Sequence, residues 1–508
     1  MLSKVFSAAT IGIEAYIVEV EVDLSSGFAQ DSMIVGLPTG SVKESKDRVK
    51  AAIKNSNLEF PYKRMTCNLA PADIKKEGAA FDLPIAIGLL ASSGQINGNS
   101  DSYIVIGELS LNGDLRPVKG VISIAMAAKD TGKKGIILPV ENADEAAVVR
   151  GLKVYPAKNL KDVVDFMNGD KILAEHEVNL DEVFKDSLKY DIDFGEIKGQ
   201  EHAKRALEIA ASGGHNIVMV GTPGSGKTML AKRLPTILPD LDLEEAIETT
   251  RIHSVAGALF KSTSIISNRP FRSPHHTASD VSLVGGGTIP KPGEVSLAHN
   301  GVLFLDEFPE FGKSVLEVLR QPLEDGFVSI SRASASVTYP ARFMLVAALN
   351  PCPCGYYNDI RKQCKCSTGE IQRYLKRISG PLLDRIDIHI DVPAVKHHAL
   401  SSEPTGENSE TIKKRVNEAR LIQKKRFKGT KIYCNAHMNS KMLKAFCQLK
   451  EDSINLLKTA IDKLGLSGRA YDKILKVSRT IADLEKSETI EIQHISEAIQ
   501  YRSLDRYF

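Results

Sequence analysis

The sequence has 508 residues, of which 43% are hydrophobic and 25% charged. This composition excludes a largely disordered chain, and the length predicts about three domains. The net charge of +3 taken alone disfavours a nucleic-acid partner or a membrane surface, and 6% aromatic residues without tryptophan disfavour extensive base stacking. No apolar run reaches the roughly 18 residues of a membrane-spanning helix. Four of the seven cysteines lie within residues 352–366, which indicates metal binding in a reducing compartment. We therefore expect a cytoplasmic protein without a membrane partner.

The predicted elements change character along the chain. Residues 1–168 mix short strands with helices, and a charged connector follows at 169–194. Strand–loop–helix patterns over 195–395 are typical of an α/β nucleotide-binding domain. After a polar, linker-like start, residues 396–508 are mostly helical. Within the first part, we expect strands at 16–22, 104–107 and 136–139, and helices at 41–55 and 121–129.

The strongest motif is a glycine-rich loop. Residues 221–228 match the pattern G-x-x-x-x-G-K-[ST], between a predicted strand and a predicted helix. Glycines let backbone N–H groups point at phosphates, and the helix N-terminus adds a favourable dipole. Lys227 would neutralise the β- and γ-phosphates of ATP, and Thr228 would bind Mg²⁺. The predicted nucleotide-binding residues are Gly221, Thr222, Pro223, Gly224, Ser225, Gly226, Lys227 and Thr228. The flanking elements disfavour the alternative of a chance glycine-rich turn.

An acidic pair follows the apolar strand predicted at 302–305. In an open parallel sheet, Asp306 and Glu307 would lie beside the phosphate loop. Asp306 would bind Mg²⁺, and Glu307 would orient and deprotonate the attacking water. The alternative is a solvated acidic pair at the end of a strand.

Three further polar residues fit a nucleotide-hydrolysing site less specifically. Asn350 ends another predicted strand, where its amide would bond the γ-phosphate or the water. Arg385 follows a tight segment, and Arg469 opens a predicted helix; either arginine would stabilise phosphate charge. An isolated arginine is more often part of a solvated ion pair, so this alternative stays open.

Four cysteines form a C-x-C, nine-residue, C-x-C pattern. Cys352, Cys354, Cys364 and Cys366 would close a tetrahedral, structural Zn²⁺ site on two tight turns. The alternative is four free thiols, because this spacing is tighter than the usual C-x₂-C. His275 and His276 also suggest a metal, but we expect no acidic residue to accompany them, so we do not predict a metal site there.

Three longer segments carry a family resemblance. The segments 271–277, 314–326 and 350–355 resemble the YifB/ComM family of magnesium-chelatase-like AAA+ ATPases, and the likeness covers nearly the whole chain. It implies an AAA+ core of the helix-2-insert clade with a helical lid, assembled as a homo-hexameric ring. Lys227, Thr228, Asp306, Glu307 and Asn350 would act within one subunit, Arg385 as the arginine finger, and Arg469 as a sensor arginine often supplied by a neighbour.

The same resemblance implies a function. Within the family, the likeness is to DNA helicases that promote branch migration and integrate single-stranded DNA by homologous recombination in natural transformation. The expected cofactors are ATP and Mg²⁺, and the expected partners are single-stranded and branched DNA, further copies of the chain and recombination proteins. The alternative is a magnesium-chelatase-like motor that remodels a protein partner.

The N-terminal part resembles the proteolytic domain of Lon, of the ribosomal-protein-S5 domain 2 type. The segments 107–113 and 138–142 carry the likeness, which implies an α+β domain. Ala80 and Ile122 occupy the positions of the Ser and Lys of the Lon dyad. Without a nucleophile and a base, covalent catalysis is lost, so we expect no peptidase activity.

DNA contacts are predicted from two segments and one basic zone. The resemblance to the helix-2-insert clade implies that segments 271–297 and 328–338 project into a ring's channel, with Arg332 and Lys291 as the expected phosphate contacts. Residues 361–450 contain 20 basic and 8 acidic residues, a local excess of 12 hidden by the near-neutral total. Its densest run adds three predicted contacts: Lys424, Lys425 and Arg426. The alternatives are surface loops and a solvated helix face.

Overall fold

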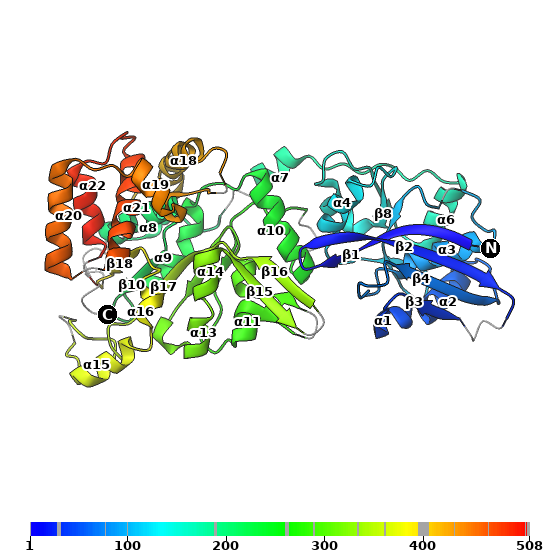
Figure 1. Ribbon diagram of the computed structural model, residues 1–508, viewed down its shortest axis with the longest axis horizontal. Coiled ribbons are helices and arrows are strands. Elements are labelled where there is room, and N and C mark those ends of the chain that lie inside the picture. The colour runs from blue at the N-terminus through cyan, green and yellow to red at the C-terminus, as the bar shows by residue number, and fades with distance from the viewer. Residues whose placement is uncertain are drawn as a thin grey trace. The chain divides into compact units, whose positions relative to one another are not determined.

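The computed structural model describes residues 2–27, 32–76, 78–98, 100–186, 190–259, 264–287, 290–332, 335–359, 362–394, 406–430, 432–465, 467–502 and 504. The chain forms two compact units, each treated by itself: unit 1 comprises residues 1–187 and 246–266, and unit 2 comprises 188–245 and 267–508. Figure 1 shows their helices and strands along the chain. Over the described ranges, we find no helix with the length and apolarity needed to cross a bilayer.

Unit 1 contains a mixed seven-stranded sheet in the order β3-β4-β2-β1-β5-β8-β9. A long antiparallel hairpin, β1 with β2, lies within the sheet; Val18, Val20 and Val22 of β2 are fully buried. Every second residue of this strand therefore faces the core, as the alternating sequence predicts. The strands are β1 Leu2–Ile11, β2 Glu14–Ser25, β3 Met33–Val35, β4 Arg64–Ala70, β5 Ile104–Val105, β8 Ile136–Pro139 and β9 Val154–Ala157, with a separate pair β6 Glu108–Leu109 and β7 Leu115–Arg116.

Apolar helices pack on this sheet. Helices α3 and α4 both lie against the β1–β2 hairpin, and the sequence of α3 is buried almost throughout. A helix that is apolar all round requires such burial. The helices of this part are α1 Gly40–Lys43, α2 Ser45–Asn55, α3 Asp82–Ser92, α4 Val121–Lys129, α5 Ala143–Ala147, α6 Leu160–Asn168 and α7 Leu180–Asp186.

The helix α10, Leu243–Ala256, belongs largely to unit 1. Its Arg251 donates to the carbonyl of Ile13 at 2.7 Å, and Ser254 donates to the buried carboxylate of Glu145. Residues 246–266 were predicted as part of the 195–395 core, but the structure groups them with the N-terminal unit instead. The difference arises because these polar bonds join positions more than 100 residues apart, which no local pattern reveals.

Unit 2 is built on a five-stranded parallel sheet in the order β11-β14-β17-β10-β18. Strand β10 lies between β17 and β18, and it pairs in parallel with both. The carboxyl end of β10 is therefore the point where the strand order reverses. Such a switch point is where α/β sheets bind ligands. The strands are β10 Ile217–Val220, β11 Phe271–Arg272, β14 Val302–Leu305, β17 Met344–Leu349 and β18 Ile388–Asp391.

Two short hairpins and several helices surround this sheet. The two hairpins are in contact. The hydroxyl of Tyr339, in β16, donates to the carbonyl of Pro290, the residue before β13, at 2.8 Å. They are formed by β12 Gly285–Gly286 with β13 Lys291–Pro292, and by β15 Phe327–Arg332 with β16 Ala335–Pro340. The helices are α8 Glu201–Gly213, α9 Lys227–Arg233, α11 Asp280–Val284, α12 Glu294–Leu297, α13 Lys313–Glu317, α14 Arg320–Asp325, α15 Thr368–Leu375 and α16 Gly380–Leu383.

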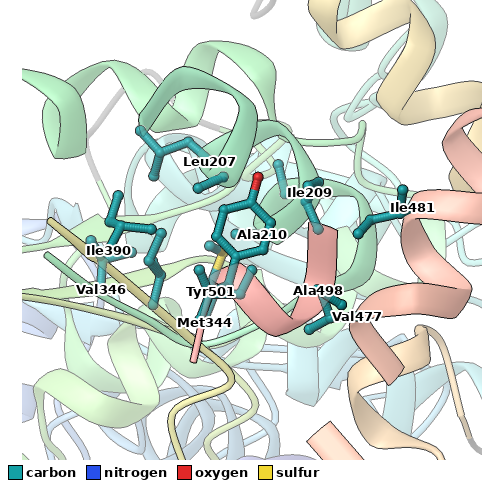
Figure 2. Packing of buried hydrophobic residues seen from close by; sticks show 14 of the residues in the cluster. Leu207, Ile209, Ala210, Met344, Val346, Ile390, Val477, Ile481, Ala498 and Tyr501 are labelled. Carbon is teal, nitrogen blue, oxygen red and sulfur yellow. The ribbon is translucent and has the colours of Figure 1, made fainter. Parts of the chain in front are cut away.

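The C-terminal helices complete unit 2 and share its core. Figure 1 draws them in orange to red beside α8. They are α18 Ser409–Arg426, α19 Ser440–Phe446, α20 Glu451–Leu464, α21 Gly468–Leu484 and α22 Ile492–Gln500. Figure 2 shows Tyr501 among side chains of α8, the sheet and α21, including Leu207, Val346 and Ile481. One apolar cluster therefore joins the parallel sheet to the helical part.

Candidate ATP site and cysteine cluster

The glycine-rich loop lies at the carboxyl end of β10, before α9. Gly224 and Gly226 have φ angles of +75° and +92°, which side-chain-bearing residues rarely adopt. The ammonium of Lys227 bonds the carbonyl of Gly221 at 2.6 Å and the amide oxygen of Asn350 at 3.2 Å. Burial lowers the pKa of Lys227, and the carboxylate of Asp306 partly opposes this shift. Lys227 thus joins the glycine-rich loop, which follows β10, to Asn350, which follows β17.

The two predicted Mg²⁺ ligands are in contact. The hydroxyl of Thr228, on α9, donates to the carboxylate of Asp306 at 2.6 Å, and Asp306 directly follows the fully buried strand β14. A hydroxyl and a carboxylate at the carboxyl end of a parallel sheet are oxygen ligands of the kind that Mg²⁺ prefers. The residues present therefore fit a magnesium ion held between α9 and β14.

Glu307 has a partner that the sequence did not reveal. Its carboxylate Oε2 lies 2.9 Å from Nδ1 of His276, and its backbone has a φ of +53°. The rings of His275 and His276 lie against each other, with their centroids 4.1 Å apart. The expectation that no acidic residue accompanies these histidines is thus wrong. The parallel register explains the contact, because Phe271 pairs with Val302 and the chain continues five residues beyond each, to His276 and Glu307.

The two candidate arginines lie around Glu324, on α14. Arg385 forms an ion pair with the Glu324 carboxylate, and Arg469 binds Asp384, the neighbour of Arg385, at 2.9 Å. The hydrogen bond from Arg385, with help from the charge of Arg469, lowers the pKa of Glu324. The structure thus brings Arg385 and Arg469 near each other, with partners other than the Lys227 loop.

The four cysteines form one cluster. Their sulfur atoms all lie within 4.8 Å of one another, with Cys352 Sγ at 3.4 Å from Cys354 Sγ and 3.7 Å from Cys364 Sγ. The four thiols are free, and a disulfide would need about 2.05 Å between sulfurs. Backbone N–H groups of Lys365 and Tyr356 lower the pKa of Cys354 to about 6, which favours the thiolate that binds metals. The donor set therefore suits a thiophilic metal.

The predicted DNA contacts differ in their surroundings. Lys291 and Lys425 are exposed, and Lys424 is exposed with Asp242 at 3.3 Å. Arg426 lies inside the helical part, where its guanidinium binds the fully buried carboxylate of Asp483 at 2.5 Å. The prediction that Arg426 contacts DNA is therefore wrong. On helix α18, Arg426 lies on the same face as the buried Gln423, whereas Lys424 and Lys425 lie on the exposed side. The side chain of Arg332 falls outside the described structure.

The two positions compared with the Lon dyad, Ala80 and Ile122, both form backbone hydrogen bonds within unit 1. The backbone N–H of the fully buried Ile122 donates to the Glu145 carboxylate at 2.9 Å. The carbonyl of Ala80 accepts a hydrogen bond from the N–H of Gly107 at 3.0 Å. Neither side chain is a nucleophile or a base. These two positions therefore offer no covalent chemistry.

Comparisons with known proteins agree with this arrangement. The sequence matches the families described as "Magnesium chelatase, subunit ChlI" over residues 193–400, "Subunit ChlI of Mg-chelatase" over 20–142, and "Magnesium chelatase, subunit ChlI C-terminal" over 406–502. It is 47% identical to "Competence protein ComM" of Haemophilus influenzae, over 99% of this chain and 98% of that protein. It is 46% identical, with the same coverage, to "Uncharacterized protein YifB" of Escherichia coli. The chain belongs to the YifB/ComM family.

This family is magnesium-chelatase-like and AAA+-like, which implies ATP and Mg²⁺ as cofactors. A more distant relative, "Magnesium-chelatase 67 kDa subunit" of Chlorobaculum tepidum, is 29% identical over 32% of this chain and 23% of that protein. The parallel sheet and the residues around Lys227 agree with the AAA+-like assignment.

One residue that bonds the phosphate loop was not predicted from the sequence. The amide of Gln200, at the start of α8, donates to the carbonyl of Ser225 at 2.5 Å and to that of Pro393 at 3.3 Å. Gln200 thereby ties the loop to the segment after β18. Its backbone φ of +59° is the structural sign of this special position, and the sequence carries no comparable signal.

Proposed function

We propose that this chain is an ATP-driven DNA translocase, a helicase that promotes branch migration and the integration of single-stranded DNA by homologous recombination in natural transformation. The convergence of Lys227, Thr228, Asp306 and Asn350 at one sheet edge carries the ATPase part. The full-length similarity to a competence protein supports the DNA part. The N-terminal domain has no peptidase role in this proposal.

Each residue of the site has a chemical role in the proposal. Lys227 and the backbone N–H groups of the loop bind the phosphates, and Thr228 with Asp306 holds Mg²⁺, which supplies charge neutralisation. Glu307 orients the attacking water and accepts its proton. Asn350, which already bonds Lys227 at 3.2 Å, orients the γ-phosphate.

The working form in this proposal is a homo-hexameric ring. Arg385 and Arg469 would reach the phosphates of a neighbouring subunit and stabilise the charge of the transition state. Their contacts support this role, since within one chain they bind Glu324 and Asp384. Those carboxylates would hold the arginines near the subunit surface until the neighbour's nucleotide replaces them.

DNA contact in the proposal is independent of base sequence. The β15–β16 hairpin exposes two hydroxyl pairs, Ser329 with Thr338 and Ser331 with Ser336, each at 3.2 Å. Hydroxyls of this kind bond sugar and phosphate oxygens. Lys291, Lys424, Lys425 and, at the hairpin tip, Arg332 would add positive charge along the backbone path.

A structural Zn²⁺ ion bound by Cys352, Cys354, Cys364 and Cys366 is part of the same proposal. Four thiolates satisfy a closed tetrahedral zinc site, which has no open position for catalysis. The observed sulfur separations of 3.4 to 3.7 Å support it, because bonds of about 2.3 Å to one zinc place tetrahedral sulfurs about 3.8 Å apart.

A second candidate is a motor that remodels a protein partner. The match of residues 193–400 to the magnesium-chelatase family favours it. The two candidates differ in what stimulates ATP hydrolysis, which is DNA for the first and a protein for the second.

The experiment that tests the helicase is strand displacement from a branched DNA. A forked substrate with one fluorescent strand is incubated with the chain, ATP and Mg²⁺. Release of the strand is expected with the unchanged chain and with Lys232→Ala, an exposed lysine of α9, but not with Lys227→Ala. Failure of the unchanged chain to release the strand, or equal release by Lys227→Ala, would contradict the proposal.

A further inference from the structure

The cysteine cluster touches the phosphate loop. Gly355, in the first turn of the cluster, lies so close to Pro223 that a Cβ atom on Gly355 would be 2.6 Å from Cδ and Cγ of the Pro223 ring. Its φ of +83° and its N–H bond to the Cys352 carbonyl, at 2.9 Å, fix this turn. The contact joins positions that are 132 residues apart in the sequence.

The cluster also continues directly from the strand that carries Asn350. Cys352 is two residues beyond Asn350 and is fully buried, and the Gly355 Cβ position is 3.9 Å from the Asn350 side chain. Asn350 in turn accepts a hydrogen bond from Lys227 at 3.2 Å. The first pair of thiols therefore lies within a few residues of Asn350, which bonds Lys227 of the phosphate loop.

A second connection runs from the other pair of thiols to the acidic residues. Ser367, next to Cys366, caps α15 through a reciprocal pair of bonds with Glu370. Beyond the far end of this helix, Arg377 binds the carboxylate of Glu310 at 2.7 Å and the carbonyl of Pro309 at 3.4 Å. Glu310 is three residues after Glu307, so α15 bridges the cluster and the segment that follows the acidic pair.

We propose that a Zn²⁺ ion in this cluster is a positioning element of the ATP site, and that losing it slows hydrolysis more than it weakens nucleotide binding. The inference rests on the proposed ATPase and zinc site. Without the metal, the two pairs of thiols would lose the strongest bonds that join them, and the Gly355 turn and α15 would lose their common anchor. Asn350 and Pro223 would then shift, and a misplacement of about 1 Å at a reacting group costs about 100-fold in rate.

Zinc removal tests the inference directly. Zinc in the purified full-length chain is counted by mass spectrometry, released with a mercurial reagent and then restored. We expect about one zinc per chain, a fall in kcat of about tenfold or more on removal, a change in fluorescent-ATP affinity of about threefold or less, and recovery with Zn²⁺. Cys364→Ser with Cys366→Ser would reproduce the loss, whereas Cys67→Ala, in unit 1, would not. A chain without zinc, or an unchanged kcat after removal, would overturn the inference.

A variant that keeps all four thiols tests the Gly355–Pro223 contact. Gly355→Ala would leave the zinc content unchanged and lower kcat, because the new Cβ pushes against the Pro223 ring. Gly429→Ala is the matched control, since Gly429 has a φ of +81° and no atom near its Cβ position. Adding Pro223→Ala to Gly355→Ala would recover part of the lost rate. Equal losses from Gly355→Ala and Gly429→Ala, or no recovery in the double variant, would contradict the contact's role.

Hydrogen exchange separates this inference from the proposed function. We expect zinc removal to increase amide exchange in 221–228 and 344–350. If the unchanged chain shows no DNA-stimulated hydrolysis but this change in exchange appears, the DNA motor fails and the positioning role stands. If exchange in both segments is unaffected by zinc, the positioning role fails whatever the activity.

Discussion

The imidazole Nδ1 of His276 lies 2.9 Å from the carboxylate Oε2 of Glu307. Glu307 is the residue that we propose as the base for ATP hydrolysis, and His276 belongs to the segment that leads into the β12–β13 hairpin, a proposed DNA contact. The pair holds the carboxylate toward this segment. A change in the segment on binding DNA would therefore alter the position of the base.

Replacing His276 by alanine should raise ATP hydrolysis in the absence of DNA. The pair is partly exposed, with 31% and 55% of the two side chains accessible, so its loss should change the rate by about 2- to 5-fold. Steady-state ATPase assays with and without DNA measure this change. His276→Gln keeps a donor for the carboxylate and should stay near the original rate. A fall in rate to the level of Glu307→Gln would show that His276 supports Glu307 rather than restraining it.

Removing the Arg385 guanidinium should stop hydrolysis while ATP still binds. Arginine fingers contribute about 10³-fold or more to the rate, and Arg385 lies outside the Lys227 loop. Arg385→Ala should therefore bind fluorescent ATP with nearly unchanged affinity and turn it over very slowly. Mixing Arg385→Ala with Lys227→Ala chains should restore some activity if the arginine acts on a neighbour's nucleotide. No restoration in the mixture would contradict action between subunits.

Charge removal at the proposed DNA surface should weaken binding equally for all sequences. Lys291→Ala and Lys425→Ala should each reduce the salt dependence of DNA binding by about one unit in the slope of log K against log salt concentration. Fluorescence anisotropy over a range of salt concentrations gives this slope. Lys458→Ala, an exposed lysine on α20, is the control and should leave the slope unchanged. An unchanged slope for both test variants would contradict DNA contacts at Lys291 and Lys425.

Asp387 should anchor the C-terminal helices to the sheet. It lies directly before β18, fully buried, with its carboxylate 2.9 Å from His215 and also paired with Lys473 of α21. Burial alone would raise the pKa of Asp387, but the charge of Lys473 and the bond with His215 outweigh it and hold the pKa below its ordinary value. Breaking such a buried pair should reduce the free energy of unfolding by about 3 to 5 kcal/mol.

The pH dependence of Asp387→Asn follows from the direction of that pKa shift. A carboxyl with a lowered pKa in the folded state stabilises the fold above its unfolded pKa, about 3.9, and loses this contribution as the pH falls further. The difference in stability between the unchanged chain and Asp387→Asn should be constant from about pH 7 to pH 5 and shrink below about pH 4. Urea unfolding at several pH values measures it, with the exposed Asp462→Asn as control. A difference that grows toward low pH would contradict this ion pair.

The parts of the site that could be predicted from the sequence are those formed by residues that lie close together along the chain. The glycine loop with its strand and helix, and the acidic pair after β14, depend on neighbouring residues whose pattern is visible in the chain. The contact of His276 with Glu307 depends on the register of β11 and β14. The contact of Gly355 with Pro223 forms only when two distant segments of the chain come together in the fold. No local sequence pattern specifies either contact. Arg426 shows a different limit: a basic run predicts charge, but the helical period decides which member of the run faces inward.

The domain boundaries show the same division. In unit 2, the strands β10, β14 and β17 were predictable from apolar runs, whereas β11 and β18 were not predicted. The alternation of β2 in unit 1 was predictable from its period of two. The second half of α10 reads as an ordinary helix following the phosphate loop, but Arg251 and Ser254 attach it to Ile13 and Glu145. Those partners become neighbours only in the folded chain.

The most direct test of the proposed DNA motor is the rate of ATP hydrolysis with and without single-stranded or branched DNA. We expect DNA to raise the rate of the unchanged chain and of Lys232→Ala, and Lys227→Ala to hydrolyse no ATP in either condition. A hydrolysis rate that DNA leaves unchanged would contradict the proposal that this chain is a DNA motor.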